Sequence, residues 1–323
     1  MKRFLVVTFL LLLCPAPLLS QASRVRLNVN YPAVGGLHTA LWVAAEGRLF
    51  EKYGLDVRLI YIPGAAMVVN ALLAGELAIG VGGGKPIVDA TLAGADLVII
   101  GGVANVPAFY FMALPEIKSV AELKGKTVGV TRFGSSTDFT TRYILRNAKI
   151  DPDRDVNILQ VGGMAELAAA ISKRLIVAAP FTPPTNLRAG KAGAKVLINV
   201  AQAGIHFPHS SIFTRQSYLH SNRETVLNFL KGYSEGIHRM VIDKGFAKKV
   251  LQKYNRDTEE EILEATYQYG LDYTVRPPYS THEGVAEILR QTEHPNAKIA
   301  NPNDFLDHSL IKSLEQAGYF AQR

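Results

Sequence analysis

Cysteine is almost absent from this chain of 323 residues. The only cysteine, Cys14, lies in the apolar N-terminal run, so residues 15–323 contain none. Beyond that run the chain cannot form an internal disulfide, a thiolate nucleophile or a zinc site with sulfur ligands. Functions that depend on such groups are therefore excluded for residues 15–323.

Long runs of one charge and the short motifs of common enzyme classes are also lacking. The formal net charge of +7 is spread along the chain, and no arginine-rich segment argues for nucleic acid as a partner. The sequence contains no G-x-S-x-G turn, P-loop, Ser–His–Asp order or paired catalytic carboxylates. It therefore predicts no catalytic residue, cofactor or metal site.

The N-terminus has the pattern of a secretory signal. Basic Met1-Lys2-Arg3 is followed by an apolar run over residues 4–13 and by the small residues of Ser20-Gln21-Ala22. This pattern predicts export to the periplasm and cleavage after Ala22. The run is too short to span a membrane comfortably. Leu12 and Leu13 stand where a lipid anchor at Cys14 would need small residues, so lipid anchoring is not expected.

The remaining residues, 23–323, are long enough to form two lobes with separate cores. Removal of Lys2 and Arg3 lowers the formal charge to +5, which is compatible with attracting small anions. Runs typical of strands alternate with helical patterns, which predicts mostly parallel sheets covered by helices. The expected strands span 26–30, 55–62, 77–81, 97–100, 127–131, 156–161, 175–179 and 195–199. Residues 221–323 are expected to be almost wholly helical, with breaks at Asn255, Pro277-Pro278 and Asn301-Pro302.

An internal echo supports two similar lobes. Gly64-Ala65-Ala66 matches Gly162-Gly163-Met164, and residues 77–80 match residues 175–178, both at an offset of 98 positions. The chain is expected to pass between the lobes near residues 105–108 and again near residues 201–207. Because ligands of open α/β sheets bind beyond the carboxyl ends of strands, two facing lobes would enclose a site between them.

Residues 126–138 carry the clearest local signal for a ligand. Thr127–Thr131 has the apolar, β-branched pattern of a buried strand, and Gly134 to Asp138 supply helix-capping and first-turn residues. A strand that leads through Gly-Ser-Ser-Thr into a helix directs backbone N–H groups and hydroxyls toward one point. Such a point attracts anionic or polar groups. The alternative is an ordinary strand–helix turn with a good N-cap.

Several segments in order resemble one family of binding proteins. They are Tyr31-Pro32-Ala33, residues 38–44 and 47–54, Ala74-Gly75-Glu76-Leu77, residues 120–130 and 134–136, and Pro180 with Pro183-Pro184. Together they resemble periplasmic substrate-binding proteins of the nitrate/sulfonate/taurine type, with their thiamine-precursor-binding relatives. The resemblance covers nearly all of residues 23–323.

This resemblance implies a two-lobe type II periplasmic-binding-protein fold that closes around its ligand by a hinge motion. It implies one lobe from residues 23–104 and 207–323, and a second from residues 105–206. It further implies a monomer that delivers a small polar or anionic organic solute to ABC permease subunits in the inner membrane. A thiamine-pyrimidine-synthase-like enzyme and a periplasmic sensor for a receptor kinase remain alternatives. The related enzymes carry a cysteine-rich motif, which this chain lacks beyond Cys14.

The predicted ligand site combines strand ends and helix starts from both lobes. Arg132 is the expected cation for an acidic group, and the alternative is a rim residue paired with Asp138 or solvent. The full set is Tyr31, Leu37, His38, Gly64, Ala65, Ala66, Gly83, Gly84, Arg132, Phe133, Gly134, Ser135, Ser136, Thr137, Gly163, Pro180 and Phe181.

Other aromatic and histidine residues have less specific expectations. Trp42 has apolar neighbours and is expected in the core, whereas His38 is expected to cap a helix or touch the ligand. Phe109 is expected to pack at the hinge. His206 and His209 flank Pro208, but no third metal ligand lies nearby in the sequence.

Overall fold

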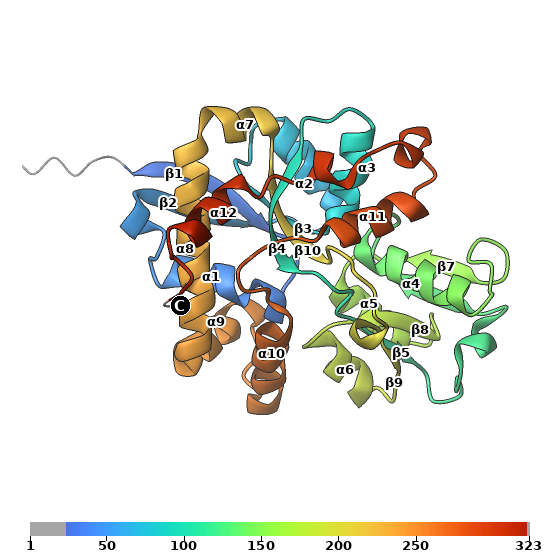
Figure 1. Cartoon of the computed structure of the whole chain (residues 1–323). Coiled ribbons are helices and arrows are strands. Elements are labelled where there is room, and N and C mark those ends of the chain that lie inside the picture. The colour runs from blue at the N-terminus through green and yellow to red at the C-terminus, as the bar shows by residue number, and fades with distance from the viewer. Residues whose placement is uncertain (1–23, 322–323) are drawn as a thin grey trace, which may run out of the picture.

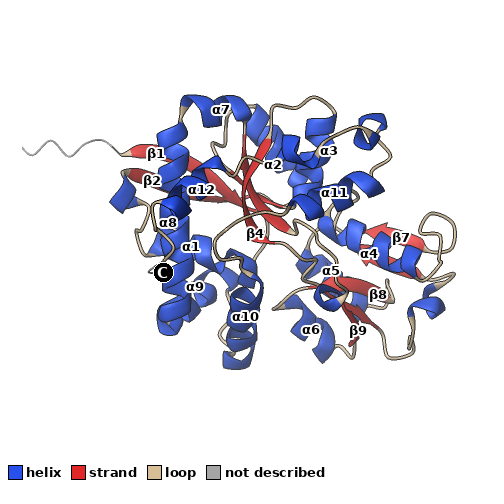
Figure 2. Ribbon diagram, in the orientation of Figure 1, coloured by secondary structure: helices blue, strands red, loops and turns tan. Residues whose placement is uncertain are grey.

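The computed structural model describes residues 24–321, so the predicted signal, its cleavage after Ala22, and Cys14 lie outside the described residues. Strands and helices alternate as far as β10, and helices dominate thereafter (Figures 1 and 2). The strands are β1 (Val25–Tyr31), β2 (Leu55–Tyr61), β3 (Gly80–Gly82), β4 (Val98–Ala104), β5 (Tyr110–Ala113), β6 (Thr127–Val130), β7 (Asn157–Gln160), β8 (Ala178–Phe181), β9 (Lys195–Asn199) and β10 (Ser210–Thr214). The helices are α1 (Thr39–Glu46), α2 (Ala65–Leu73), α3 (Gly84–Leu92), α4 (Ser136–Asn147), α5 (Met164–Ser172), α6 (Thr185–Lys191), α7 (Gln216–Ser221), α8 (Arg223–Ile242), α9 (Lys244–Asn255), α10 (Glu260–Tyr273), α11 (His282–Gln291) and α12 (Ser309–Gln316).

The first lobe contains β1–β4 and β10. β1 pairs with β2 in parallel, and β10 pairs with both β3 and β4 in the antiparallel direction. A parallel bridge between Val29 and Ile79 sets β3 beside β1. The strands therefore follow one another in the order β2-β1-β3-β10-β4.

The second lobe contains one sheet with the order β7-β6-β8-β5-β9. β6 is parallel to β7 and β8, whereas β5 is antiparallel to β8 and β9. Each lobe thus has four strands in one direction and one reversed strand in the fourth position. This shared arrangement accounts for the internal echo in the sequence, since β3 corresponds to β8 and α2 to α5.

Each reversed strand follows a passage of the chain between the lobes. We call residues 105–109 the first crossover, which leads into β5, and residues 203–209 the second crossover, which leads into β10. The backbone N–H of Phe207 donates to the carbonyl of Asn105 (2.9 Å), so the two crossovers lie side by side. The two-lobe α/β fold predicted from the sequence is confirmed, and the division at residues 104/105 and 206/207 stays a prediction.

The structure differs from the sequence prediction at four strands. β5 is not among the expected strands. β10 was not expected, although it forms the middle of the pairing between β3 and β4. The strands expected at 77–81 and 175–179 begin later, at Gly80 and Ala178. The predicted helical break at Asn255 falls on the last residue of α9, the break at Pro277-Pro278 lies between α10 and α11, and the break at Asn301-Pro302 lies between α11 and α12, where Pro302 begins a short 3-10 helix.

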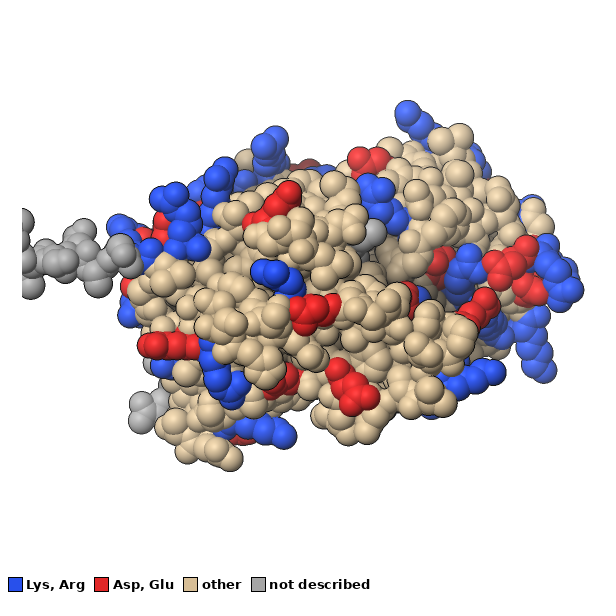
Figure 3. All heavy atoms as spheres, turned by 90° about the horizontal axis from the view of Figure 1, so that it is seen from above, with Lys and Arg blue, Asp and Glu red and all other residues tan. Residues whose placement is uncertain are grey.

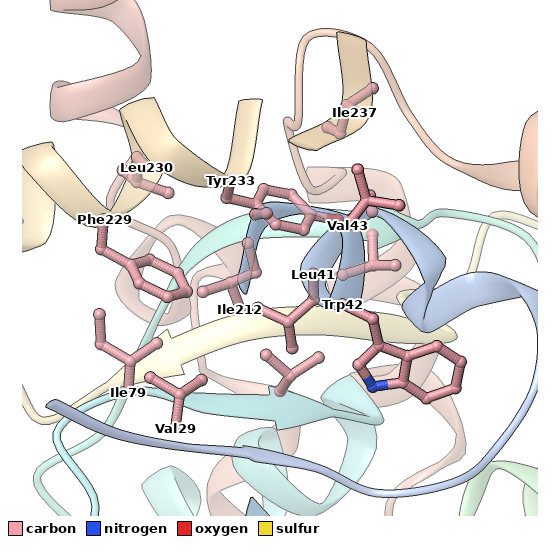
Figure 4. Packing of buried hydrophobic residues seen from close by; sticks show 14 of the residues in the cluster. Val29, Leu41, Trp42, Val43, Ile79, Ile212, Phe229, Leu230, Tyr233 and Ile237 are labelled. Carbon is pink, nitrogen blue, oxygen red and sulfur yellow. The ribbon is translucent and has the colours of Figure 1, made fainter. Parts of the chain in front are cut away.

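The core of the first lobe lies between its strands and helices α1 and α8 (Figure 4). Trp42 is fully buried there, as expected from its apolar neighbours, and its ring stacks on Tyr254 at 4.5 Å between centroids. Helices α1 and α8 approach closely, because a Cβ atom on Gly236 would lie 2.3 Å from the carbonyl oxygen of Ala40. Only glycine fits this position without moving one of the helices.

The two lobes also touch away from the crossovers. Arg188 in α6 pairs with Asp257 (3.0 Å), and Lys191 pairs with Glu259 at the start of α10 (2.5 Å). The carbonyl oxygen of Pro183 lies close to Gly35 in the first lobe, 3.0 Å from where a Cβ atom would stand. In this conformation, therefore, the lobes are in direct contact.

The surface carries charges of both signs. Basic and acidic side chains are interspersed over the face shown in Figure 3. Among residues 24–321, no helix has the length and apolar character needed to cross a membrane.

Candidate functional site

A cavity of about 250 Å³ lies between the two lobes. Its walls come from the ends of strands and the starts of helices in both lobes, and from both crossovers. Its lining includes Gly36, Leu37, His38, Tyr61, Gly64, Gly83, Phe109, Thr131, Arg132, Ser135, Ser136, Thr137, Gly163, Glu166, His209, Ser210 and Tyr269. Because parallel strands of each lobe end at this cavity, it occupies the position at which open α/β sheets bind ligands.

Many of the residues predicted for the ligand site line this cavity. From the first lobe they are Leu37, His38, Gly64 and Gly83, and from the second Arg132, Ser135, Ser136, Thr137 and Gly163. Sequence positions about a hundred residues apart are therefore brought together as expected. Contact between these residues and a ligand stays a prediction.

Other predicted residues lie outside the cavity lining. The Tyr31 ring packs edge-on against Trp42 (5.5 Å between centroids), Phe133 is 56% exposed, and Phe181 is buried in the core of the second lobe. Gly84, Gly134 and Pro180 also lie outside the lining. Ala65 and Ala66 form the first turn of α2, and their side chains are not among those described.

Arg132 reaches across the cavity from the second lobe to the first. Its side chain lies over Gly64, where a Cβ atom would stand 2.6 Å from Arg132 Nε. Gly64 has φ +95°, a conformation that residues with side chains rarely adopt. Another residue at this position would therefore have a strained backbone and would also displace the Arg132 side chain. Arg132 Nε is buried and has no hydrogen-bond partner among the described residues.

Asp138 does not pair with Arg132. Its carboxylate instead accepts hydrogen bonds from Arg142 Nε (2.8 Å) and from the backbone N–H of Gly134 (2.9 Å). The alternative in which Arg132 serves as the ion-pair partner of Asp138 is therefore wrong. The guanidinium remains available for an acidic group in the cavity.

The hydroxyl groups at the start of α4 bond to one another. Thr131, Ser135 and Thr137 form a triangle of hydroxyl contacts between 2.8 and 3.1 Å. Ser135 also accepts the backbone N–H of Asp138 (3.4 Å) and so caps the helix. Ser136 donates across the lobe boundary to the carbonyl of His209 (3.4 Å).

The helix starts around the cavity are less open to an anion than the sequence suggests. At α3, the backbone N–H of Gly84 already donates to the carbonyl of Pro208 (2.8 Å). At α5, the Glu166 carboxylate folds back over Gly163, with Oε2 2.5 Å from where a Cβ atom would stand. A carboxylate in this position meets the favourable end of the helix dipole. The positive charge offered to a ligand therefore rests mainly on Arg132.

His38 and His209 are both buried neutral groups in the cavity lining. Burial lowers the pKa of His38 to about 4, and its Nδ1 has no hydrogen-bond partner among the described residues. Burial, with a smaller effect from His38, lowers the pKa of His209 to about 3. His38 precedes α1 without capping it through its side chain, so of the two roles expected for it, only ligand contact remains open.

Sequence reasoning missed several residues of the lining. Tyr61 ends β2 directly opposite Tyr31 in the parallel register, and the rule that selected Tyr31 could have found it. Tyr269 lies within α10, where no local pattern marks a ligand site. For His209 the sequence suggests only a possible metal pair with His206, and for Phe109 it favours hinge packing over a place in an aromatic ligand wall, yet both residues line the cavity. Among residues 24–321, no group of three or more His, Cys, Asp or Glu side chains could hold a metal ion.

The fold and the cavity together define a two-lobe protein with a candidate ligand site between the lobes. Residues 36–243 match the family model described as NMT1/THI5 like, and the chain belongs to this family. A protein of Brachyspira hyodysenteriae, named as a candidate ABC transporter periplasmic binding protein, is 24% identical over 264 residues. That match covers 74% of this chain and 71% of the relative.

Two solved structures have the same fold. A protein from Bordetella bronchiseptica has a TM-score of 0.79 at 17% identity, covering 92% of this chain and 99% of its own. The alkanesulfonate-binding protein SsuA from Xanthomonas axonopodis pv. citri, bound to MOPS, has a TM-score of 0.69 at 20% identity. It covers 84% of this chain and 92% of its own.

Proposed function

We propose that this protein is the extracytoplasmic solute-binding component of an ABC importer and is not an enzyme. It holds a small polar or anionic organic solute in the cavity between its lobes. Support comes from membership in the NMT1/THI5-like family, from the named ABC transporter relative, and from the sulfonate-binding neighbour. The solute class follows from the single guanidinium and the several hydroxyl groups in the cavity.

One observation carries this proposal. Three buried polar atoms without hydrogen-bond partners among the described residues belong to side chains that line one cavity: Arg132 Nε, His38 Nδ1 and Ser210 Oγ. A buried donor or acceptor without a partner costs about 1–3 kcal/mol. A solute that bonds to these groups removes that cost, and because they come from both lobes, it also holds the lobes together.

The same arrangement supports closure by a hinge motion. In our proposal, residues 23–104 and 207–323 move as one lobe and residues 105–206 as the other, about the two crossovers. Arg132 reaches the start of α2 only when the lobes are close. A solute that bonds both to Arg132 and to the first lobe therefore favours the closed form. A monomer is sufficient for this mechanism, since every part of the cavity comes from one chain.

The proposed location is the periplasm, after removal of residues 1–22, and the proposed partners are permease subunits of the inner membrane. The N-terminal sequence of protein recovered from the periplasm is expected to begin at Ser23. A mature chain that begins at a lipid-modified Cys14 would contradict the proposed processing.

A ligand screen tests the binding function. Thermal shift of residues 23–323 with alkanesulfonates, aromatic carboxylates, nitrate and pyrimidines is expected to identify at least one stabilising solute. Small-angle scattering at saturation with that solute is then expected to give a smaller radius of gyration. Turnover of the solute would contradict the non-enzymatic role, and an unchanged scattering profile would contradict hinge closure.

A further inference from the structure

His209 contacts both passages of the chain between the lobes. It is the last residue of the second crossover and directly precedes β10. Its Nδ1 accepts a hydrogen bond from the backbone N–H of Ala108 in the first crossover (3.2 Å), and its ring lies 4.4 Å from that of Phe109. One side chain therefore joins the starts of the two reversed strands, β5 and β10.

The hydrogen bond from Ala108 fixes the form of the imidazole. An N–H donor can only approach a ring nitrogen that carries no proton, so Nδ1 is the acceptor and the proton lies on Nε2. The ring stays neutral at neutral pH because its pKa is lowered to about 3, mainly by burial. The backbone of Ala108 is held at its carbonyl as well, because the Tyr269 hydroxyl donates a hydrogen bond to the Ala108 carbonyl oxygen (2.5 Å).

The protonated nitrogen of His209 faces the cavity. The residue lines the cavity, and Nε2 has no hydrogen bond to the described residues. It is also not among the fully buried polar atoms that lack a partner, so it is accessible. At this end of the cavity, His209 consequently offers a hydrogen-bond donor and no acceptor.

We propose that His209 determines specificity by requiring a hydrogen-bond acceptor on the solute, because the crossovers fix which of its nitrogens carries the proton. This inference rests on the proposed binding function. A solute that presents only donors at this position would demand the other tautomer, which would set the Nδ1 proton against the Ala108 N–H. Sulfonate, carboxylate or ring-nitrogen acceptors satisfy the requirement, whereas an ammonium group does not.

The tautomer can be tested without any solute. Long-range proton–nitrogen correlation spectra of residues 23–323 with ¹⁵N-labelled histidine report which ring nitrogen is protonated. The His209 signal is assigned as the one that disappears in His209→Asn. We expect this signal to show a protonated Nε2 and an unprotonated Nδ1 between pH 6 and pH 8, which lies well above the lowered pKa of His209. A protonated Nδ1 would overturn the proposal.

Two substitutions separate the two edges of the ring. In His209→Asn, the amide oxygen takes the place of Nδ1 and keeps the bond from Ala108, but nothing replaces Nε2. In His209→Gln, the amide group reaches the place of Nε2, but no acceptor remains for the Ala108 N–H. We expect His209→Asn to keep the melting temperature and to bind ethanesulfonate, whose oxygens only accept, about tenfold more weakly. His209→Gln is expected to melt at a lower temperature and to bind within about threefold of wild type.

The outcomes distinguish this inference from the proposed function. The exposed His220, outside the cavity, is the control, and His220→Asn is expected to match wild type in both measurements. If wild type binds ethanesulfonate and His209→Asn binds it with the same affinity, the specificity role of His209 is overturned. If wild type binds none of the screened anions, the proposed function fails instead, and the tautomer spectrum still decides whether the crossovers fix the ring.

Discussion

The two lobes share a strand order but contribute different chemistry to the cavity. The second lobe provides side chains, namely the Arg132 guanidinium, the Glu166 carboxylate and the hydroxyls at the start of α4. The first lobe provides mainly backbone and small or neutral groups, such as Gly36, Gly64 and the neutral His38. The same strand order therefore supports one cavity wall with charged and hydroxyl side chains and another built mainly from backbone and neutral groups.

The difference shows how a closed site can be both tight and selective. Glycines in the first lobe let groups of the second lobe approach closely, as Arg132 does over Gly64 and Ser136 does beside Gly83. The charged groups named above all belong to the second lobe, so the proposed hinge motion would leave their mutual spacing unchanged. We expect the preference for negative charge to follow Arg132 of the second lobe, and the requirement for a hydrogen-bond acceptor to follow His209, which precedes β10 of the first lobe.

The largest expected effect concerns the packing of the first lobe. Gly236→Ala places a Cβ atom 2.3 Å from the backbone oxygen of Ala40, and we expect the free energy of unfolding to fall by about 3 kcal/mol. Gly190→Ala in α6 is the matched control, because nothing lies within 4 Å of the added atom. It is expected to raise stability by about 0.5 kcal/mol. Urea denaturation measures both, and equal stabilities would contradict the close helix contact.

Arg132→Ala tests the charged wall of the second lobe. We expect the affinity for the solute found by the screen to fall about tenfold to a hundredfold, because a charge-assisted hydrogen bond contributes about 1.5–3 kcal/mol. Arg146→Ala, in the same lobe but outside the cavity, is expected to bind like wild type. Titration calorimetry decides, and a loss below twofold for Arg132→Ala would place this arginine outside the binding interaction.

Ser135→Ala separates capping from binding at the start of α4. Loss of the cap is expected to cost about 1 kcal/mol of folding stability, and loss of a neutral cavity hydroxyl about fivefold in affinity. Thr281→Ala removes a similar cap from α11, away from the cavity. It should lower stability by a similar amount and leave affinity unchanged. If both variants lose affinity equally, the effect arises from stability alone.

The smallest effect is expected at the ion pair between the lobes. Burial opposes ionisation of Asp257, but the backbone N–H of Glu259 and the Arg188 guanidinium outweigh it, so the pKa of Asp257 lies below its usual value. A lowered carboxyl pKa stabilises the fold above the pKa of the unfolded chain, and this contribution disappears as pH falls through the folded value. The pair should therefore persist at neutral pH and break in acid.

Arg188→Ala is expected to weaken solute binding by no more than about threefold, since Arg188 is 44% exposed, and by less at high salt. Arg174→Ala removes an ion pair with Glu116 that lies within the second lobe, and it should leave binding unchanged. Calorimetry at two salt concentrations compares them. A large loss in Arg188→Ala would show that the lobe contact contributes more to closure than an exposed pair normally does.

The sequence predicted the elements whose patterns are local. β9 spans the expected residues, and α4 begins among the capping and first-turn residues Gly134 to Asp138 that the sequence indicates. β10 was not predicted because Ser210–Thr214 is short and follows a crossover that contains proline. It forms a strand by pairing with β3 and β4, which are distant in the sequence. Its register depends on residues far away in the chain, which no local pattern records.

The candidate site divides in the same way. Strand ends and helix starts are local features, and nine of the predicted residues at such places line the cavity. Tyr269 enters it from within α10, because the packing of that helix directs it there, whereas Glu166 enters from the first turn of α5 and folds back over Gly163. Phe133 was expected inside but is exposed, since the turn at Gly134 (φ +75°) begins directly after it. Side-chain direction in such turns depends on the finished fold.

The reversed strand β10 has a consequence for how the chain folds. The second lobe is built from one continuous segment, so its sheet can form as soon as β5 to β9 are available. The first lobe must wait, because β3 and β4 meet only through β10, which is made after the whole second lobe. Pairings over such long sequence separations form slowly. We therefore expect the inserted lobe to become protected from hydrogen exchange first during refolding, and the lobe that contains both ends of the chain to follow.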